Sequence, residues 1–163
     1  AGRPPKRARH EEPVAAGSFE LREEQGDLFN CPADASLAHC VSECMAMGKG
    51  IAVLFKKKFR RVDRLKAQHA RIGAGALLER PGAKGPAFVY YLVTKAKYWN
   101  KPRLEDVRAS CVWMREHCVA NGVRLLCMPR IGCGLDGLRW PEVKVMLVDV
   151  FRDTKMRIIV YSL

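Results

Sequence analysis

Apolar and polar positions along the chain follow two repeats, one typical of strands and one typical of helices. Strands are predicted for the short apolar or alternating segments 19–24, 36–42, 76–78, 87–94, 125–128 and 156–163. Helices are predicted where apolar residues recur three and four positions apart, in 53–59, 62–71, 102–121 and 141–150. Strands interleaved with helices predict an α/β fold of three layers, α/β/α, around a mixed central sheet.

The first 18 residues differ from the rest of the chain. They are rich in Pro, Ala, Gly and Arg and lack apolar periodicity, so we expect a disordered basic tail over 1–18 and one folded domain over 19–163. Within the tail, Pro4 to Arg9 resembles a short nuclear-import signal. This run predicts a nuclear protein, with the cytoplasm as a second location.

Charge and cysteine content narrow the function classes. The net charge of +12 favours anionic partners such as nucleotides, phosphates or nucleic acid, although a basic solvated surface gives the same value. No apolar run reaches the roughly 20 residues of a membrane span, and no signal-peptide core opens the chain, so we expect neither a membrane protein nor a secreted one.

Seven cysteines in mostly apolar runs indicate reduced thiols. His39, Cys40 and Cys44 come nearest to a metal cluster, but their spacing fits no zinc motif, and we expect no metal or cofactor.

The segment from Met128 to Trp140 has the order strand, glycine loop, helix. Its glycines let the backbone approach a ligand closely, and Pro141 suits the first position of the following helix. Loops of this kind hold phosphate through backbone N–H groups and a helix N-terminus. The carboxylate of Asp136, inside the loop, would repel a phosphate bound there, so this residue needs another role. The alternative interpretation is an ordinary glycine turn with an aspartate cap.

A second glycine loop, Met47 to Ala52, also lies between a strand and a helix and could grip the other end of a diphosphate. The alternative is a flexible connection. Asp27 follows the first strand and could bind a base or sugar, or could simply stabilise a turn. The basic run Lys56 to Lys58, with Arg60 and Arg61, is either a nucleic-acid contact or a solvated helix face.

Lys95 directly follows the most apolar predicted strand. Ligands of open α/β sheets lie at the carboxyl ends of the strands. A partly desolvated amine at that edge could serve as a nucleophile. The alternative is a surface lysine that reaches out of the strand end into water.

Taken in order, five segments resemble motifs of the macrodomain family, and more narrowly of its ADP-ribose glycohydrolases that use a lysine and an aspartate. These segments are Gly26–Phe29, Leu37–Cys40, Met47–Ala52, Tyr91–Lys95 and Pro129–Asp136. The resemblance extends from about residue 19 to the C-terminus. It implies a single macrodomain with a cleft for ADP-ribose, and it identifies Lys95 and Asp136 as the catalytic pair.

The resemblance also implies the residues that bind the substrate. Asp27 and Leu28 would hold the adenine, and Tyr161 and Leu163 would close that end of the cleft. The remaining positions would line the riboses and the diphosphate: Ser42, Gly48, Gly50, Ile51, Arg130, Ile131, Gly132, Cys133, Gly134 and Leu135.

Two departures from the family pattern bear on the chemistry. Lys49 stands where most relatives have a small residue, and it either faces phosphate or narrows the pocket. His39 to Ser42 replaces the Asn-Ala-Ala-Asn motif of the larger hydrolase macrodomains, which favours the lysine–aspartate mechanism over attack by a water.

Three functions follow from the resemblance. The first is a hydrolase that removes ADP-ribose from acidic side chains of proteins and from O-acyl-ADP-ribose. The second is a reader that binds ADP-ribose without cleaving it. The third is a hydrolase of ADP-ribose attached to nucleic acid, for which the basic surface would matter. We expect a monomer that acts on ADP-ribosylated proteins in the DNA damage response.

Overall fold

The computed structural model describes residues 18–163. The predicted tail and its import-like run therefore lie outside the described residues, except for Ser18. The strands are β1 (Glu20–Gln25), β2 (Ser36–Ser42), β3 (Ala74–Glu79), β4 (Phe88–Lys95), β5 (Leu125–Pro129) and β6 (Arg157–Ser162). The helices are α1 (Ile51–Phe59), α2 (Val62–Ala67), α3 (Leu104–Ala120) and α4 (Trp140–Phe151), with a short 3₁₀ helix, η1 (Leu28–Asn30). No helix in this part of the chain is both long and apolar enough to cross a bilayer.

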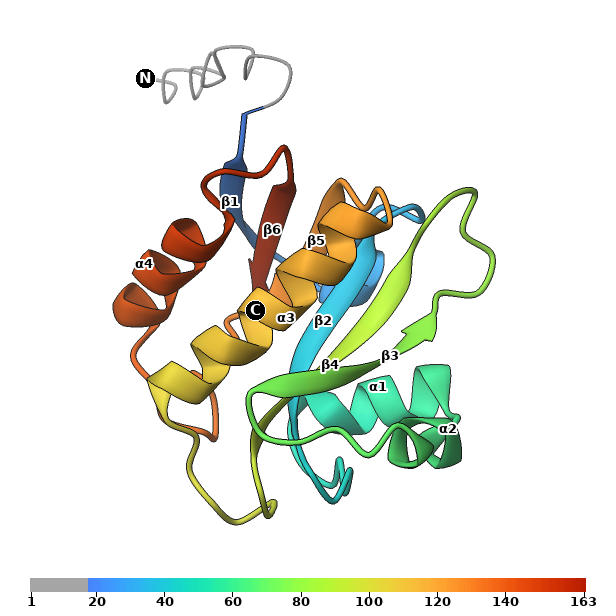
Figure 1. Cartoon of the computed structure of the whole chain (residues 1–163), viewed down its shortest axis with the longest axis vertical. Helices are drawn as coiled ribbons and strands as arrows, with labels where there is room; N and C mark the ends of the chain where they lie inside the picture. Colours follow the sequence, from blue (N-terminus) through green and yellow to red (C-terminus); the bar gives the residue numbers. More distant parts are fainter. Residues whose placement is uncertain (1–17) are drawn as a thin grey trace, which may run out of the picture.

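The six strands form one sheet in the order β1-β6-β5-β2-β4-β3. Every neighbouring pair is parallel except β3 with β4, so the sheet is mixed, as predicted. Because the first five strands in this order are parallel, their carboxyl ends share one edge. The loops that follow β2 and β4 emerge together at the lower edge of Figure 1.

Helices cover both faces of the sheet and complete the three predicted layers. On one face α3 and α4 pack through residues such as Met114 and Leu147, and on the other α1 and α2 pack through Phe55 and Leu65. Strand β4 serves both faces, because Tyr90 points into the first core and Tyr91 into the second. This double burial explains why its sequence is a continuous apolar run.

The predicted helix over 62–71 is wrong at its end, because α2 stops at Ala67. Gln68 instead uses its side chain to pair with edge strand β3, accepting from the Leu77 N–H at 2.9 Å and donating to the Leu77 carbonyl at 2.8 Å. His69 then adopts φ +50°, a left-handed conformation that a helix cannot continue through. A tertiary contact therefore ends this helix, which periodicity alone does not reveal.

Candidate active site

The predicted site residues gather at the carboxyl edge of the parallel strands. Ser42 at the end of β2 lies opposite Lys95 at the end of β4, where the register shifts by one residue. The loop 130–139 follows β5 at the same edge. At the far end, Gln25 pairs with Ser162, and the Gly26 N–H donates to the Ser162 carbonyl at 2.8 Å. Because β1 and β6 end side by side, Asp27 and Leu163 both lie at this end of the edge, where the resemblance places the adenine.

Lys95 and Asp136 form an ion pair at the centre of this edge. The Lys95 ammonium donates to Asp136 Oδ1 across 2.6 Å, and the two side chains are only 14% and 18% exposed. The two residues lie 41 positions apart in the chain. They meet because β4 and β5 end at the same edge of the sheet, and Asp136 lies in the loop that follows β5. The pair joins a nitrogen that can act as a nucleophile to a carboxylate that can accept its proton.

The loop after β5 holds Asp136 in a tight backbone turn. Gly132 has φ +71°, and the Leu138 N–H donates to the Gly132 carbonyl at 2.8 Å. A Cβ at Gly132 would come within 2.9 Å of Leu138 Cδ1, so a larger residue there is both strained and crowded. Gly137 also has a positive φ, +81°, directly after Asp136. These two glycines allow the chain to turn back and aim the carboxylate at Lys95.

The first glycine loop faces the second. Gly50, with φ +60°, begins α1, and a Cβ there would lie 3.7 Å from Leu135 Cδ1. Met45 and Met47 in the same loop have φ +53° and +46°, although neither is glycine. Their side chains are buried in the core, which holds this strained backbone in place. The structure therefore brings the two predicted loops together. Lys49 is exposed beside them.

The open space at the second loop lies around Gly134. A Cβ built on Gly134 meets no heavy atom within 4 Å in the described structure, and the residue is exposed. Leu135 beside it is 66% exposed. A diphosphate that approaches the backbone here would meet no side chain from Gly134 itself. This is the geometry expected of a close-approach glycine.

Several predicted contact residues have buried or occupied side chains. Leu28, Ser42, Ile131 and Tyr161 are all at most 9% exposed, so a ligand would reach them mainly through the backbone. Arg130 lies over the Trp140 ring at 5.6 Å and pairs with Glu23 at 3.6 Å. Its guanidinium is therefore engaged with β1 and α4.

Among the other predicted residues, the Asp27 carboxylate accepts from the Phe29 N–H at 2.9 Å and caps η1. This hydrogen bond is the one expected of a turn aspartate, and binding of the adenine by Asp27 stays a prediction. Cys133 donates its thiol to the Ile131 carbonyl at 3.3 Å, and Ile51 is half-buried at the start of α1. Leu163 is 99% exposed.

Two thiols near the pair have opposite character. Burial, followed by the negative charge of Asp136, raises the pKa of Cys40 to about 12, so this thiol stays neutral. Burial raises the pKa of the Cys44 thiol, but hydrogen bonds from the Ser42 hydroxyl and from backbone N–H groups lower it. Together the hydrogen bonds outweigh burial, so the pKa of Cys44 is lowered. Ser42 Oγ lies 3.0 Å from the Cys44 sulfur. Within residues 18–163 no three His, Cys, Asp or Glu side chains are arranged to hold a metal.

Lys101 is a site residue that sequence reasoning missed. Its ammonium donates to the backbone carbonyl of Leu135, the residue before Asp136. The contact ties the loop after β4 to the loop after β5. It therefore helps to hold the carboxylate beside Lys95. A lysine in a polar loop carries no pattern that predicts such a contact.

Two surface hollows accompany this edge without containing the ion pair. One, of about 680 Å³, runs along α1 from Met47 and Gly48 past Lys56, Lys57 and Arg60. Lys56 also donates to the Ala46 carbonyl at 3.3 Å, and the basic residues of α1 are otherwise exposed. Three residues of the predicted basic cluster, Lys56, Lys57 and Arg60, thus line a hollow that begins at the first glycine loop, whereas Lys58 lies over the Phe29 ring at 5.1 Å.

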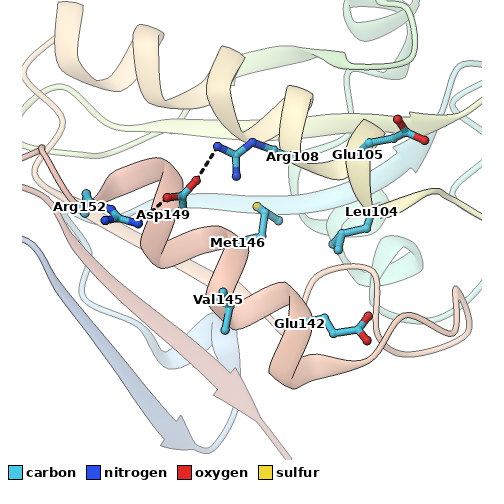
Figure 2. A pocket seen from close by; sticks show the side chains of 8 residues that line it. All are labelled: Leu104, Glu105, Arg108, Glu142, Val145, Met146, Asp149 and Arg152. Atoms are coloured by element: carbon cyan, nitrogen blue, oxygen red, sulfur yellow. Dashed lines mark hydrogen bonds and ion pairs between the residues drawn. The ribbon is translucent and has the colours of Figure 1, made fainter.

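The second hollow, of about 560 Å³, lies between α3 and α4 and is shown in Figure 2. Leu104, Val145 and Met146 provide its apolar lining. At one end Arg108 donates to Asp149 at 2.5 Å, which closes that end with an ion pair. Neither Lys95 nor Asp136 lines this hollow, so it is separate from the ion pair.

Comparison with known proteins supports the site that the geometry indicates. No protein-family model matches the chain. The chain is 50% identical over 139 residues to the ADP-ribose glycohydrolase OARD1 of Homo sapiens, covering 85% of this chain and 89% of that protein. It is 32% identical over 130 residues to a DNA ADP-ribosyl glycohydrolase of Thermus aquaticus, which covers 76% of this chain and 36% of that longer protein.

Among solved structures, the macrodomain of Thermus aquaticus DarG superposes with a TM-score of 0.78 at 28% identity, covering 89% of this chain and 99% of that one. The macrodomain fold predicted from the sequence is therefore confirmed. With half of its aligned residues shared across nearly the full length of a glycohydrolase, the chain belongs to the ADP-ribose glycohydrolases of the macrodomain family.

Proposed function

We propose that the protein removes ADP-ribose from ester-linked glutamate and aspartate side chains of proteins and from O-acyl-ADP-ribose. The observation that carries this proposal is the Lys95–Asp136 pair at 2.6 Å, set between two glycine loops. A module that only reads ADP-ribose needs contacts to the riboses and phosphates. It has no use for a nearly buried amine paired to a carboxylate.

The pair suggests a sequence of steps that balances. Asp136 accepts a proton from the Lys95 ammonium, and the neutral amine attacks the anomeric carbon of the distal ribose. The bond from that carbon to the ester oxygen breaks, and the carboxylate leaves. The ribose ring then opens to a protonated Schiff base: Asp136 gives its proton to the ring oxygen, and the nitrogen loses one proton to the departing carboxylate or to water. Water hydrolyses the Schiff base, which frees Lys95 and releases ADP-ribose.

The test separates binding from chemistry. Lys95→Arg keeps the positive charge next to Asp136 but cannot form a Schiff base, so it is the matched control for Lys95→Ala. Both variants should bind ADP-ribose in calorimetry and release none from a glutamate-ADP-ribosylated protein, as followed by chromatography. Borohydride added during turnover should trap a mass adduct on the unchanged protein and none on either variant. Release by Lys95→Arg at the unchanged rate would refute the covalent step.

Asp136 is tested in the same assay. Asp136→Asn should lower kcat by about 10²- to 10⁴-fold, the usual contribution of a positioned acid or base. Binding should fall less than turnover, because the glycine loops supply most of the expected contacts. If kcat is unchanged, Asp136 has no part in the proton transfers. If the Lys95 variants show no borohydride adduct and still release ADP-ribose, Asp136 acting on a water becomes the better account.

A second substrate class is favoured by two observations. A relative with 32% identity bears the name DNA ADP-ribosyl glycohydrolase, and the hollow along α1 places Lys56 and Lys57 beside the first glycine loop. We propose that this basic wall carries the phosphates of ADP-ribosylated nucleic acid. Lys56→Ala/Lys57→Ala should then reduce the salt dependence of oligonucleotide binding by about two in the slope of log K against log salt. A flat salt response of the unchanged protein would leave the wall as a solvated surface.

We also propose that the protein acts as a monomer in the nucleus, in the DNA damage response. The support for the nucleus is the basic run Pro4 to Arg9. Fusing residues 1–18 to a cytoplasmic fluorescent reporter should move the reporter into the nucleus. A reporter that stays cytoplasmic would remove the tail as the basis for nuclear localisation. Sedimentation of the whole chain would reveal the oligomeric state.

A further inference from the structure

The loop that follows Lys95 presents two aromatic rings to solvent. A turn spans Lys97 to Asn100, in which the Asn100 N–H donates to the Lys97 carbonyl at 3.0 Å. The Asn100 side chain in turn accepts from the Lys97 N–H at 3.0 Å. Tyr98 and Trp99 occupy the tip of this turn, 56% and 64% exposed. Their rings meet edge to face, with centroids 4.9 Å apart and planes at 90°. Rings of this size are normally buried, so their position on an ordered turn calls for a partner.

The turn lies at the rim of the site. It begins two residues after Lys95, and Lys101 on its far side donates to the Leu135 carbonyl beside Asp136. Both ends of the segment are thus tied to the catalytic pair. In the proposed reaction the group that bears ADP-ribose leaves from the carbon that Lys95 attacks. The aromatic turn is therefore close to where that leaving group must extend.

The charges around the rings identify the chemistry of the partner. Lys97 and Lys101 flank the aromatic pair and are exposed. Arg103, further along, is already paired with Asp106 at 3.0 Å and with Glu105 at 3.1 Å. Lysines on both sides of two exposed rings match the requirements of single-stranded nucleic acid, whose phosphates meet the cations and whose bases stack on the rings. Lys101 donates to the Leu135 carbonyl with one of its three N–H groups and keeps its charge. An acidic peptide would satisfy the lysines but leave the rings without a planar partner.

We propose that Tyr98 and Trp99 form a stacking site for a nucleobase adjacent to the ADP-ribosylated nucleotide of a single-stranded nucleic acid. The inference rests on the proposed glycohydrolase function, because it needs ADP-ribose held between the glycine loops while the strand continues over the turn. A single strand fits better than a duplex, since only unstacked bases offer their faces to the rings. The basic wall of α1 and this turn would then hold two different parts of the same strand.

The first experiment measures binding alone. A fluorescently labelled oligothymidylate of about 12 nucleotides, within the site size of such grooves, is titrated with the protein and followed by anisotropy. Tyr98→Ala/Trp99→Ala should weaken binding by about 5- to 150-fold, the range seen when one stacked base loses its ring. Tyr98→Phe/Trp99→Phe keeps both rings and should retain most of the affinity. An affinity that the alanine variant leaves unchanged would overturn the proposal.

The second experiment measures specificity. The ratio of kcat/KM for a single-stranded oligonucleotide with one ADP-ribosylated base to that for a glutamate-ADP-ribosylated peptide should fall by a similar factor in the alanine variant. If the peptide substrate suffers as much or more, the turn recognises peptides and the nucleobase site is wrong. If the unchanged protein releases ADP-ribose from neither substrate, the glycohydrolase function fails. The anisotropy titration then still decides whether the stacking site exists.

Discussion

Protonation of one buried histidine should make the fold sensitive to mild acid. His39 lies in β2 with no exposed surface, and its ring stacks on Phe55 with centroids 3.8 Å apart. Burial lowers the pKa of His39 from 6.5 to about 3, opposed only weakly by the backbone of Cys40. The ring is therefore neutral in the folded protein over the whole range in which an exposed histidine would gain a proton.

The size and sign of the effect follow from linkage. Below pH 6.5 the unfolded chain binds a proton at His39 that the folded chain does not, down to a pH of about 3. The free energy of unfolding therefore falls as pH falls, by about 1.4 kcal/mol for each pH unit in that window. Going from about pH 7.5 to about pH 5 should remove about 2 kcal/mol through this residue alone.

Urea unfolding at the two pH values measures this loss, and His39→Leu provides the reference. Leucine has a similar volume, remains apolar against Phe55 and cannot titrate. All other groups that titrate in this range contribute nearly equally to both proteins and cancel in the comparison. Between about pH 7.5 and about pH 5 the unchanged protein should lose about 2 kcal/mol more than His39→Leu. Equal losses would show that the burial of His39 does not control the acid sensitivity.

Three further predictions concern the loops. Gly134→Glu should abolish ADP-ribose binding in calorimetry, because its side chain would occupy the space left for the diphosphate. The thermal midpoint should stay nearly unchanged, since a Cβ at Gly134 meets no other atom within 4 Å in the described structure. The control is Gly85→Glu, which is equally open but lies between β3 and β4, and this variant should bind ADP-ribose normally. Gly132→Ala should lower the urea unfolding free energy by about 1–2 kcal/mol, the cost of a left-handed alanine, and an unchanged midpoint would contradict the strain. Lys101→Met should reduce kcat more than ADP-ribose affinity by loosening the Asp136 loop, and a loss confined to affinity would exclude this positioning role.

Local sequence patterns were enough to predict the three layers and the two glycine loops. The apolar run of β4 reports burial on both faces, and the three- and four-residue spacing in α3 gave a helix within two residues of the observed Leu104–Ala120. Glycines at 48, 50, 132, 134 and 137 marked the two loops, because only a residue without a Cβ serves such backbone conformations and close approaches well. These signals are local, and each can be seen within a short window of the chain.

Contacts between distant segments could not be predicted from local sequence patterns, because they depend on how the strands pair. Parallel strand pairing places Lys95 within 2.6 Å of Asp136, and no local pattern specifies that distance. The same pairing lets Lys101 reach the Leu135 carbonyl, and Gln68 ends α2 by pairing with β3. A polar side chain in a loop can find many partners, and the fold alone selects one. Strand and helix periodicity records which side of an element is buried, whereas the partners of polar groups depend on which strand ends share an edge.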